Sequence, residues 1–442
     1  MGRKPLDIGK VALELIMSED YETKKKLAKK ITDIAYKKGI YLSSIHELYV
    51  ARGKAECGGF TVPAINLRAM TYDLARAIFR VALKNNAGAF IFEIAKSEMG
   101  YTNQPPIEYA AVVLAAAVKE GYAGPVFIQA DHCQLNAKKF ASDAGAEIEA
   151  LKKLISEAVQ AGFYNIDIDS STLVDLSKKK IDKQQYWNYE VCAKLTQFIR
   201  QIQPRGVEIS VGGEIGEVGS KNSTPEDLRA FMGGYRRRLR KGRTGISKIS
   251  IQTGTSHGGV VLPDGSMAEV SLDFDTLRDL GEIARKEYGL GGVVQHGAST
   301  LPAEAFHKFA ECDTCEVHLA TQFQNMIYDS PHFPQELRER MYEWIKANLS
   351  SERKEGQTEE QFIYKTRKKA LGPFKKEIMG LSEDVRHKIV ADIEDTFDFL
   401  FRQLNAVNNK DIVAQYITLK RVIIRKRDED ASPVEHDGEG DD

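Results

Sequence analysis

The sequence predicts an α/β fold: a (β/α)8 TIM barrel with an N-terminal helical segment and a C-terminal helical extension. Between residues 58 and 330, short apolar strand-like segments alternate with amphipathic helical stretches, which is the order expected of a parallel sheet with a helix after each strand. Eight such segments occur, and eight strands close a barrel of this kind. An open doubly wound sheet is the alternative, but no GxGxxG motif follows the first strand.

The predicted strands are apolar runs of strand length that end in small or polar residues. In chain order they cover residues 60–66, 88–93, 124–133, 164–169, 207–214, 246–253, 291–299 and 314–321. The third run opens with a Gly-Pro turn signal and ends in Asp131-His132. Apolar packing does not explain an acid beside an imidazole at the end of a buried strand. This pair is therefore the first candidate for a functional site. The alternative is a structural role, in which the Asp-His pair only caps the segment that follows.

The rest of the chain divides by pattern. Helices predicted between the strands cover residues 72–84, 106–120, 147–160, 186–203, 225–231, 275–288 and 302–310. The N-terminal segment, residues 1–57, is predicted to be helical, residues 58–330 form the catalytic barrel, and residues 331–427 form the extension. In the extension, apolar residues three and four apart predict helices over 334–349, 359–370 and 381–404. Residues 428–442 carry eight acids and are predicted to be a disordered tail.

Composition excludes several classes of protein. The chain is 42% hydrophobic and 28% charged with a net charge of −1, which is typical of a soluble globular protein. Its short basic runs lack interleaved aromatics, so no nucleic-acid partner is expected. No signal peptide and no apolar run of membrane-spanning length is found, so no membrane partner is expected. Five cysteines indicate a reduced, cytoplasmic protein, and the single CxxC at 312–315 does not predict structural zinc.

Four metal-binding side chains occur at the ends of predicted strands. His132 ends the third strand, Glu214 the fifth and His296 the seventh, and His257 follows the sixth. In a TIM barrel these ends share one rim. Three imidazoles and one carboxylate on a common rim predict a site for a divalent transition metal, with Zn²⁺ the favoured ion. One such histidine alone would more often be a structural residue.

Small residues and hydroxyls follow the sixth, seventh and eighth strands. They include Gly258, Gly297, Ser299 and Thr321. Backbone N–H groups in such loops bind anions, and TIM barrels often bind phosphate after strands seven and eight. For any one of these loops, the alternative to anion binding is that its glycine only allows a tight turn. Three such loops beside a metal site favour a phosphate.

Six short blocks of sequence resemble the class II, metal-dependent fructose-bisphosphate aldolases. The resemblance covers residues 60 to about 330, and the blocks in order are Val-Pro-Ala-Ile-Asn at 62–66, Gln-Ala-Asp-His at 129–132, Gly-Glu-Ile-Gly at 213–216, Ser-His-Gly at 256–258, Gln-His-Gly-Ala-Ser at 295–299 and Val-His-Leu-Ala-Thr at 317–321. The resemblance implies reversible cleavage of a ketose 1,6-bisphosphate, above all fructose 1,6-bisphosphate, to dihydroxyacetone phosphate and glyceraldehyde 3-phosphate. It also implies a homo-oligomer, a dimer or a tetramer.

The resemblance assigns roles residue by residue. It implies that the metal ligands are His132, Glu214, His257 and His296. It implies that Asp131 is the acid/base that handles the proton of the C4 hydroxyl, and that Asn66 is a polar substrate contact. The phosphate ligands implied are Gly258, Gly297, Ser299 and Thr321. His318 stands where the family has an Asn that contacts the substrate near the metal, so a substrate contact is expected of it.

Two further positions depart from the family pattern. Members carry acids in the loop after the fifth strand, where this chain has Lys221 and Asn222. Glu217 or Glu226 could substitute, and the second acid/base is unassigned. A serine after the second strand is replaced by Ala95.

Three alternatives to this function stay open at the level of sequence. A class I aldolase would need a Schiff-base lysine, and Lys248 lies on the predicted sixth strand, although toward the wrong end. A tagatose bisphosphate or another sugar phosphate is an alternative substrate. A non-catalytic, zinc- and phosphate-binding partner of a catalytic subunit is the third.

Overall fold

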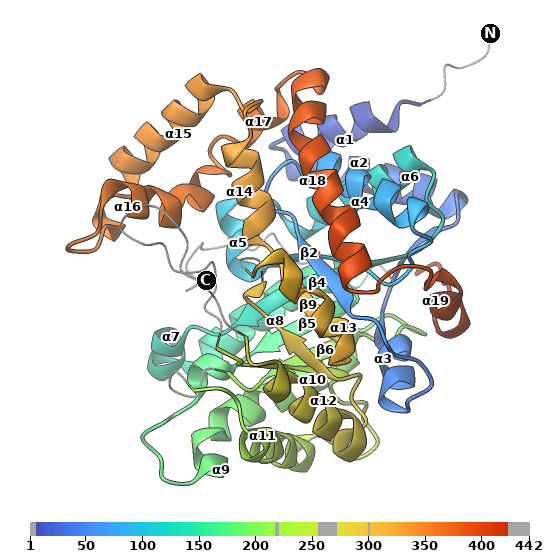
Figure 1. The fold of residues 1–442 in the computed structure, drawn as a ribbon, viewed down its shortest axis with the longest axis vertical. Helices are drawn as coiled ribbons and strands as arrows, with labels where there is room; N and C mark the ends of the chain where they lie inside the picture. The colour runs from blue at the N-terminus through green and yellow to red at the C-terminus, as the bar shows by residue number, and fades with distance from the viewer. Residues whose placement is uncertain (1–5, 217–220, 255–271, 299–300, 423–442) are drawn as a thin grey trace.

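A closed barrel of eight parallel strands forms the centre of the molecule (Figure 1). The computed structural model describes residues 6–216, 221–254, 272–298 and 301–422. The barrel strands are β2 (Val62–Asn66), β3 (Ile91–Ala95), β4 (Gly124–Gln134), β5 (Asn165–Asp169), β6 (Ser210–Glu214), β7 (Lys248–Ile251), β8 (Val293–Gln295) and β9 (Glu316–Leu319). Neighbours in the chain pair in parallel, and β2 pairs with β9 to close the ring. The predicted (β/α)8 TIM barrel is confirmed.

Helices surround the barrel, and their ends follow local sequence signals. The connecting helices are α4 (Thr71–Lys84), α5 (Lys96–Tyr101), α6 (Pro106–Glu120), α7 (Ala137–Ser142), α8 (Ala144–Ala161), α9 (Ile181–Gln184), α10 (Tyr186–Ile202), α11 (Pro225–Arg238), α12 (Phe274–Tyr288), α13 (His307–Glu311) and α14 (Thr321–Asp329). The side chain of Asp143 caps the start of α8, and Gly162 ends that helix in a left-handed conformation.

Helix α11 continues seven residues beyond its predicted end at residue 231. The prediction was wrong because Gly233 and Gly234 favour an end there. A Cβ on Gly234 would lie 2.3 Å from the ring of Tyr189 on α10. The close approach of the two helices therefore requires glycine, and their packing offsets its low helix propensity.

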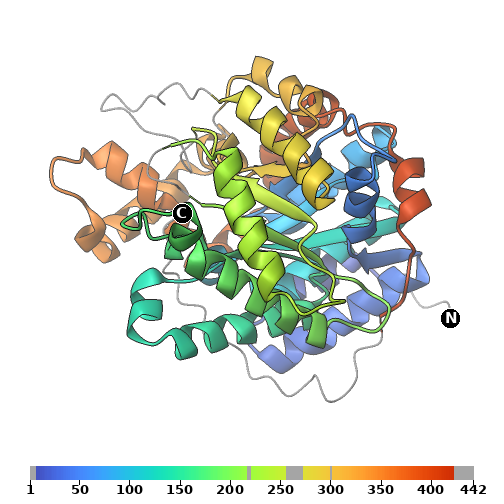
Figure 2. The ribbon, with the colours of Figure 1, turned by 90° about the horizontal axis from the view of Figure 1, so that it is seen from below.

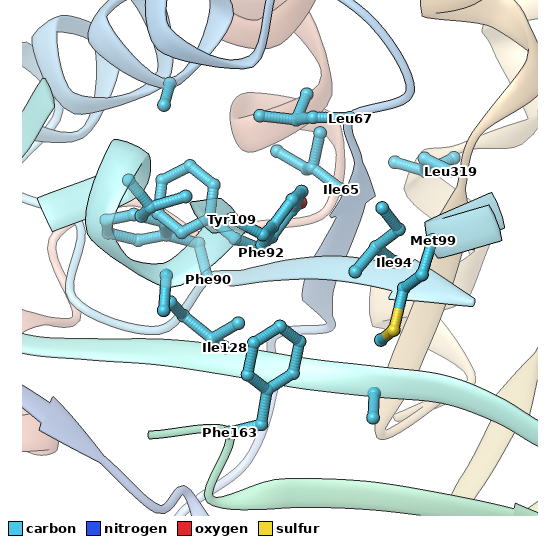
Figure 3. Close-up of a cluster of buried hydrophobic side chains, with 14 of the residues drawn as sticks. Ile65, Leu67, Phe90, Phe92, Ile94, Met99, Tyr109, Ile128, Phe163 and Leu319 are labelled. Atoms are coloured by element: carbon cyan, nitrogen blue, oxygen red, sulfur yellow. The ribbon is translucent and has the colours of Figure 1, made fainter. Parts of the chain in front are cut away.

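The apolar core lies between the strands and the helices that cover them. Figure 3 shows Ile65 of β2, Phe92 and Ile94 of β3 and Ile128 of β4 in one cluster with Tyr109 of α6. All five side chains are fully buried. Parallel strands that are covered by helices bury apolar side chains in this way, which explains the continuous apolar runs in the sequence.

The N-terminal segment contains a strand that its helical pattern does not predict. It consists of α1 (Ile8–Met17), α2 (Tyr21–Lys37), β1 (Ile40–Ser43) and α3 (His46–Gly53). Strand β4 is longer than its barrel neighbours, since its pairing with β3 starts only at Phe127 and that with β5 at Gln129. The exposed start of β4 would leave backbone groups unpaired, and β1 pairs with it from Gly124 to Phe127.

Helix α3 covers the amino-terminal end of the barrel. The guanidinium of Arg52, only 1% exposed, donates to the carbonyls of Phe60 and Gly291, which lie just before β2 and β8. Apolar residues of α3, including Leu48 and Tyr49, form a small buried cluster with the first residues of several strands. The helix therefore seals the barrel floor.

The C-terminal extension is helical, as predicted. Its helices are α15 (Gln335–Asn348), α16 (Glu359–Thr366), α17 (Lys375–Met379), α18 (Glu383–Gln403) and α19 (Lys410–Tyr416). In Figures 1 and 2, α15 and α16 stand out to one side of the barrel, whereas α18 lies along α4. Buried Glu108 of α6 pairs with Lys24 of α2 and with Lys375 of α17, which links both flanking segments to the barrel. The limits set at residues 57, 330 and 427 remain predictions.

Two sequence predictions concern the termini and membranes. The acidic tail, residues 428–442, lies outside the described residues. Among the helices that the structure describes, none is long and apolar enough to cross a membrane.

The Arg52 contacts predict a large loss of stability on substitution. Arg52→Leu leaves the carbonyls of Phe60 and Gly291 without this donor and removes one ion pair of Asp313, which also pairs with Arg285. We expect it to lower the free energy of unfolding by about 3 kcal/mol. Urea denaturation followed by circular dichroism measures this. Arg402→Leu removes an exposed i,i+4 ion pair with Asp398 and serves as the control, with little change expected. Equal midpoints for the two variants would contradict the assignment.

Candidate active site

The candidate site lies at the carboxyl ends of the barrel strands. Asn66 ends β2, Asp131 and His132 lie near the end of β4, Glu214 ends β6, and His296 follows β8. These ends meet at one rim, where TIM barrels carry their catalytic side chains. The sequence prediction of a common rim is confirmed by the closed strand order.

A β-bulge turns two consecutive side chains of β4 into the site. Successive residues of a regular strand point to opposite faces, yet Asp131 and His132 both contact residues of the barrel interior and the rim, His318 and His296 respectively. The pairing of β4 with β5 shifts register between Ala130 and Cys133, and His132 has a φ of +38°. The local backbone distortion lets Asp131 reach His318 on β9 while His132 reaches the ligand cluster.

His132 lies at the centre of a cluster of nitrogen and oxygen ligands. Its Nε2 is 3.2 Å from Nδ1 of His296. Its Nδ1 is 3.2 Å from Oδ2 of Asp169 and 3.6 Å from Oε2 of Glu214. Nε2 of His296 lies 3.0 Å from the hydroxyl of Ser250, which orients the ring so that Nδ1 faces the cluster.

The donor set fits a divalent metal. Ligand atoms of Asp131, His132 and His296 lie within 4.8 Å of one another, as do those of His132, Asp169 and Glu214. Imidazole nitrogens combined with carboxylate oxygens are a ligand set of zinc and related metals. The structure brings three of the four predicted ligands together, and the fourth, His257, lies outside the described residues.

Asp169 was missed as a candidate ligand. It ends β5, and its carboxylate also accepts from Gln134 and Ser171. The available signal was an acid at the end of the fourth predicted strand, the same position in which Glu214 ends the fifth.

The electrostatics of the cluster favour a cation. Burial and the neighbouring Asp169 carboxylate raise the pKa of Glu214 to about 8. Burial would lower the pKa of His132, but the carboxylates of Asp131, Asp169 and Glu214 outweigh it and hold that pKa well above its usual range. Burial would likewise raise the pKa of Asp131, but His132 and His318 outweigh it and hold the carboxyl ionised.

His318 occupies the barrel interior beneath Asp131. Its Nδ1 lies 3.0 Å from Oε2 of Glu93 and 3.2 Å from Oδ1 of Asp131, and its Nε2 lies 2.6 Å from Oε1 of Glu316. Glu316 also pairs with the ammonium of Lys248. The sequence prediction placed His318 near the metal, but it did not predict this network of buried acids.

The predicted substrate contacts that fall within the described residues lie at the same rim. Asn66 donates from Nδ2 to Oε2 of Glu98, whose other oxygen is 2.7 Å from Nε of Arg68. Gly297 directly follows His296 with a φ of +69°, and Thr321 is the first residue of α14. Gly258 and Ser299 lie outside the described residues. Thr321 thus stands at a helix N-terminus, where N–H groups favour an anion.

Two departures from the family pattern, Asn222 and Ala95, and one candidate substitute acid, Glu226, have defined surroundings. Asn222 donates to Asp273, 2.8 Å away. Glu226 is exposed in the first turn of α11. Ala95 is buried, and its backbone N–H donates to Glu98. Glu217 lies outside the described residues, so none of the described residues is assigned as a second acid/base.

Comparison with solved structures finds several chains that are similar to this one. A structure from Sinorhizobium meliloti, described as a probable tagatose 6 phosphate kinase, superimposes with a TM-score of 0.51 at 14% identity, over 80% of this chain and 98% of that chain. A fructose-bisphosphate aldolase from Campylobacter jejuni gives 0.47 at 20% identity, over 84% and 96%. The YdjI aldolase from Escherichia coli K12 gives 0.43 at 13%, over 78% and 99%. A search of curated proteins finds no match.

The family is shown by sequence rather than by these distant structures. A family model described as fructose-bisphosphate aldolase class-II matches residues 50–388, which is most of the chain and includes every site residue discussed above. The chain belongs to the class II fructose-bisphosphate aldolase family.

Proposed function

We propose that this protein is a metal-dependent aldolase that reversibly cleaves a ketose 1,6-bisphosphate, above all fructose 1,6-bisphosphate, to dihydroxyacetone phosphate and glyceraldehyde 3-phosphate. The observation that supports it most is the bulge of β4, which presents a carboxylate and an imidazole side by side to the same rim. A metal site alone needs His132 but not Asp131. The acid beside the ligand favours a proton-transfer step at the metal.

The proposed metal is Zn²⁺, with His132, Glu214, His257 and His296 as its ligands. Bound there, it supplies Lewis-acid stabilisation for the negative charge that develops when the carbon–carbon bond breaks. The close approach of His132 to His296 and to the carboxylates of Asp169 and Glu214 supports this site. Asp169 is a further candidate ligand or orienting group.

Asp131 is proposed as the acid/base of the cleavage. Its ionised carboxylate takes the proton of the C4 hydroxyl, the C3–C4 bond breaks, C4 becomes the aldehyde carbon, and the electron pair remains on the dihydroxyacetone half as an enediolate. Protonation of C3 then completes the second product. In the reverse direction Asp131 returns its proton to the new hydroxyl.

The phosphate of the dihydroxyacetone half is proposed to bind at Gly258, Gly297, Ser299 and Thr321. The described members support this, because Gly297 adjoins a metal ligand and Thr321 begins α14. A phosphate held there anchors the substrate and fixes the distance from its reacting carbons to Asp131. Asn66, at the end of β2 beside β9, is proposed as a further polar contact.

The Schiff-base alternative is disfavoured by the surroundings of Lys248. Its side chain is 1% exposed and its ammonium lies 2.9 Å from Asp167 and against Glu316. Burial would lower the pKa of Lys248, but these two carboxylates outweigh it and raise the pKa above the usual range. A Schiff-base lysine needs a neutral amine within reach of the substrate.

Chelation and substitution of Asp131 test the proposed activity. Zinc-loaded protein is expected to cleave fructose 1,6-bisphosphate or tagatose 1,6-bisphosphate in a coupled assay, and EDTA should abolish the activity. Asp131→Asn should lower kcat by about 10²–10⁴-fold, the range for loss of an acid/base, while bound zinc, measured by atomic absorption, is retained. Asp175→Asn changes a surface carboxylate paired with Lys178 and should leave kcat unchanged.

The outcomes separate the alternatives. Activity that survives EDTA and is trapped by borohydride would support a lysine mechanism. A zinc-containing protein that cleaves neither sugar would favour the non-catalytic partner.

Metal binding is expected to depend on pH and to release protons. In the metal-free protein Glu214 keeps its proton up to about pH 8 and His132 is protonated, because both pKa values are raised. A metal ion must displace these protons, so its affinity should rise with pH from 6 to 8. Titration calorimetry in two buffers of different ionisation enthalpy measures the release. Glu214→Gln should reduce the number of protons released, and an affinity that is constant over this range would contradict the assignment.

A further inference from the structure

Both ring nitrogens of His318 face carboxylates. Nδ1 lies 3.0 Å from Glu93 and 3.2 Å from Oδ1 of Asp131, while Nε2 lies 2.6 Å from Glu316. The side chain is only 4% exposed. Nε2 is hydrogen-bonded to Glu316, whereas Nδ1 lies at ion-pair distance from Glu93 and Asp131 without an aligned hydrogen bond to either.

The contact fixes one oxygen of Asp131. Oδ1 accepts the backbone N–H of His132 at 2.9 Å and lies 3.2 Å from Nδ1 of His318. Oδ2 lies 3.9 Å from Nε2 of His132, on the side of the proposed ligands. The backbone N–H of His132 thus donates to Oδ1, and the imidazole of His318 lies at ion-pair distance from the same oxygen, which leaves Oδ2 on the side of the proposed ligands.

Glu316 in turn fixes the ring of His318. It is fully buried on β9. Its Oε1 accepts from Gln129 at 2.8 Å, from Lys248 and from His318. Its Oε2 accepts the hydroxyl of Tyr49. With partners on both oxygens, the carboxylate cannot turn without breaking charge-assisted hydrogen bonds.

Tyr49 brings the N-terminal segment into this network. It lies on α3, is fully buried and reaches up into the barrel from its floor. Arg52 fixes the same helix to the carbonyls that precede β2 and β8. A continuous series of contacts therefore runs from α3 to the rim, through Tyr49, Glu316, His318 and Asp131.

We propose that Tyr49 of α3 and Glu316 position the carboxylate of Asp131 through His318, and that these three side chains are positioning residues for the aldol cleavage. The proposal rests on the proposed function of Asp131. It gives His318 a role other than the substrate contact expected from its place in the sequence. It also gives α3 a role beyond closure of the barrel floor.

Two variants of the buried network and one matched control test the proposal. Glu316→Gln keeps the size of the side chain but weakens the hold on His318, and it should lower kcat about 10–100-fold, as loss of a supporting residue does. Tyr49→Phe removes only the hydroxyl and should lower kcat by about 3–10-fold. For both variants KM should stay within about threefold. Tyr235→Phe removes an equally buried hydroxyl, bonded to Thr196, and should leave kcat unchanged.

A double-substitution cycle separates positioning from substrate contact. If Glu316 acts through the imidazole, Glu316→Gln should change kcat by less than about twofold when added to His318→Asn. Multiplicative losses would overturn the proposal, as would a His318→Asn variant that changes KM alone. Thermal melts of all variants identify losses that come from unfolding, and Tyr49→Phe keeps the test open if Glu316→Gln does not fold.

A crystallographic readout keeps this proposal separate from the proposed function. In zinc-loaded Glu316→Gln the carboxylate of Asp131 should rotate or shift relative to wild type, whereas in Tyr235→Phe it should not. If the wild-type protein cleaves no ketose bisphosphate, the proposed function fails and the position of Asp131 still decides whether it is held through His318. If the wild type is active, an unmoved Asp131 together with an unchanged kcat overturns the positioning role alone.

Discussion

Carboxylates buried inside the barrel must face cations or several hydrogen-bond donors, because an isolated ionised acid in a protein interior costs several kcal/mol. The interior below the rim meets this condition with its own residues. Lys248 lies between Asp167 and Glu316. Burial raises the pKa of Asp167 to about 6, whereas Lys248 and His318 outweigh burial at Glu316 and lower its pKa. Both acids therefore contact the same ammonium, but the pKa of Asp167 is raised and that of Glu316 is lowered.

Within the described part of the chain, the rim lacks such an internal ammonium. Asp167, Glu316 and His318 also form a group with metal-ligand spacing, but the ammonium of Lys248 already supplies its cation. At the rim, Asp169 and Glu214 lie against one imidazole, and in the described residues no lysine or arginine pairs with either of them. The donor set of this second group could hold a divalent ion.

The sequence predicted the rim better than the interior. Strand ends that share an edge follow from the alternation of strands and helices, so His132, Glu214 and His296 were predictable without side-chain geometry. Strand β1 could not be predicted from the sequence. Its four residues form a strand only because β4 is longer than its barrel neighbours and offers them a partner. The bulge at His132 and the contact of Glu316 with Tyr49 were not predictable either, because both depend on residues far apart in the chain.

One departure of this chain from its family pattern, His318, lies among the buried acids of the same interior. An Asn in place of His318 would offer a neutral amide to Glu93, Asp131 and Glu316, and an amide has only one nitrogen with which to donate to acids on two sides. An imidazole can donate from both nitrogens, along two directions. A histidine therefore suits this position beside buried acids better than an asparagine. The loss of kcat on replacement of His318 is expected to depend on whether residue 316 carries a charge. Asp131 on β4, His318 and Glu316 on β9 and Tyr49 on α3 thus form one series of contacts, although these elements lie far apart in the chain.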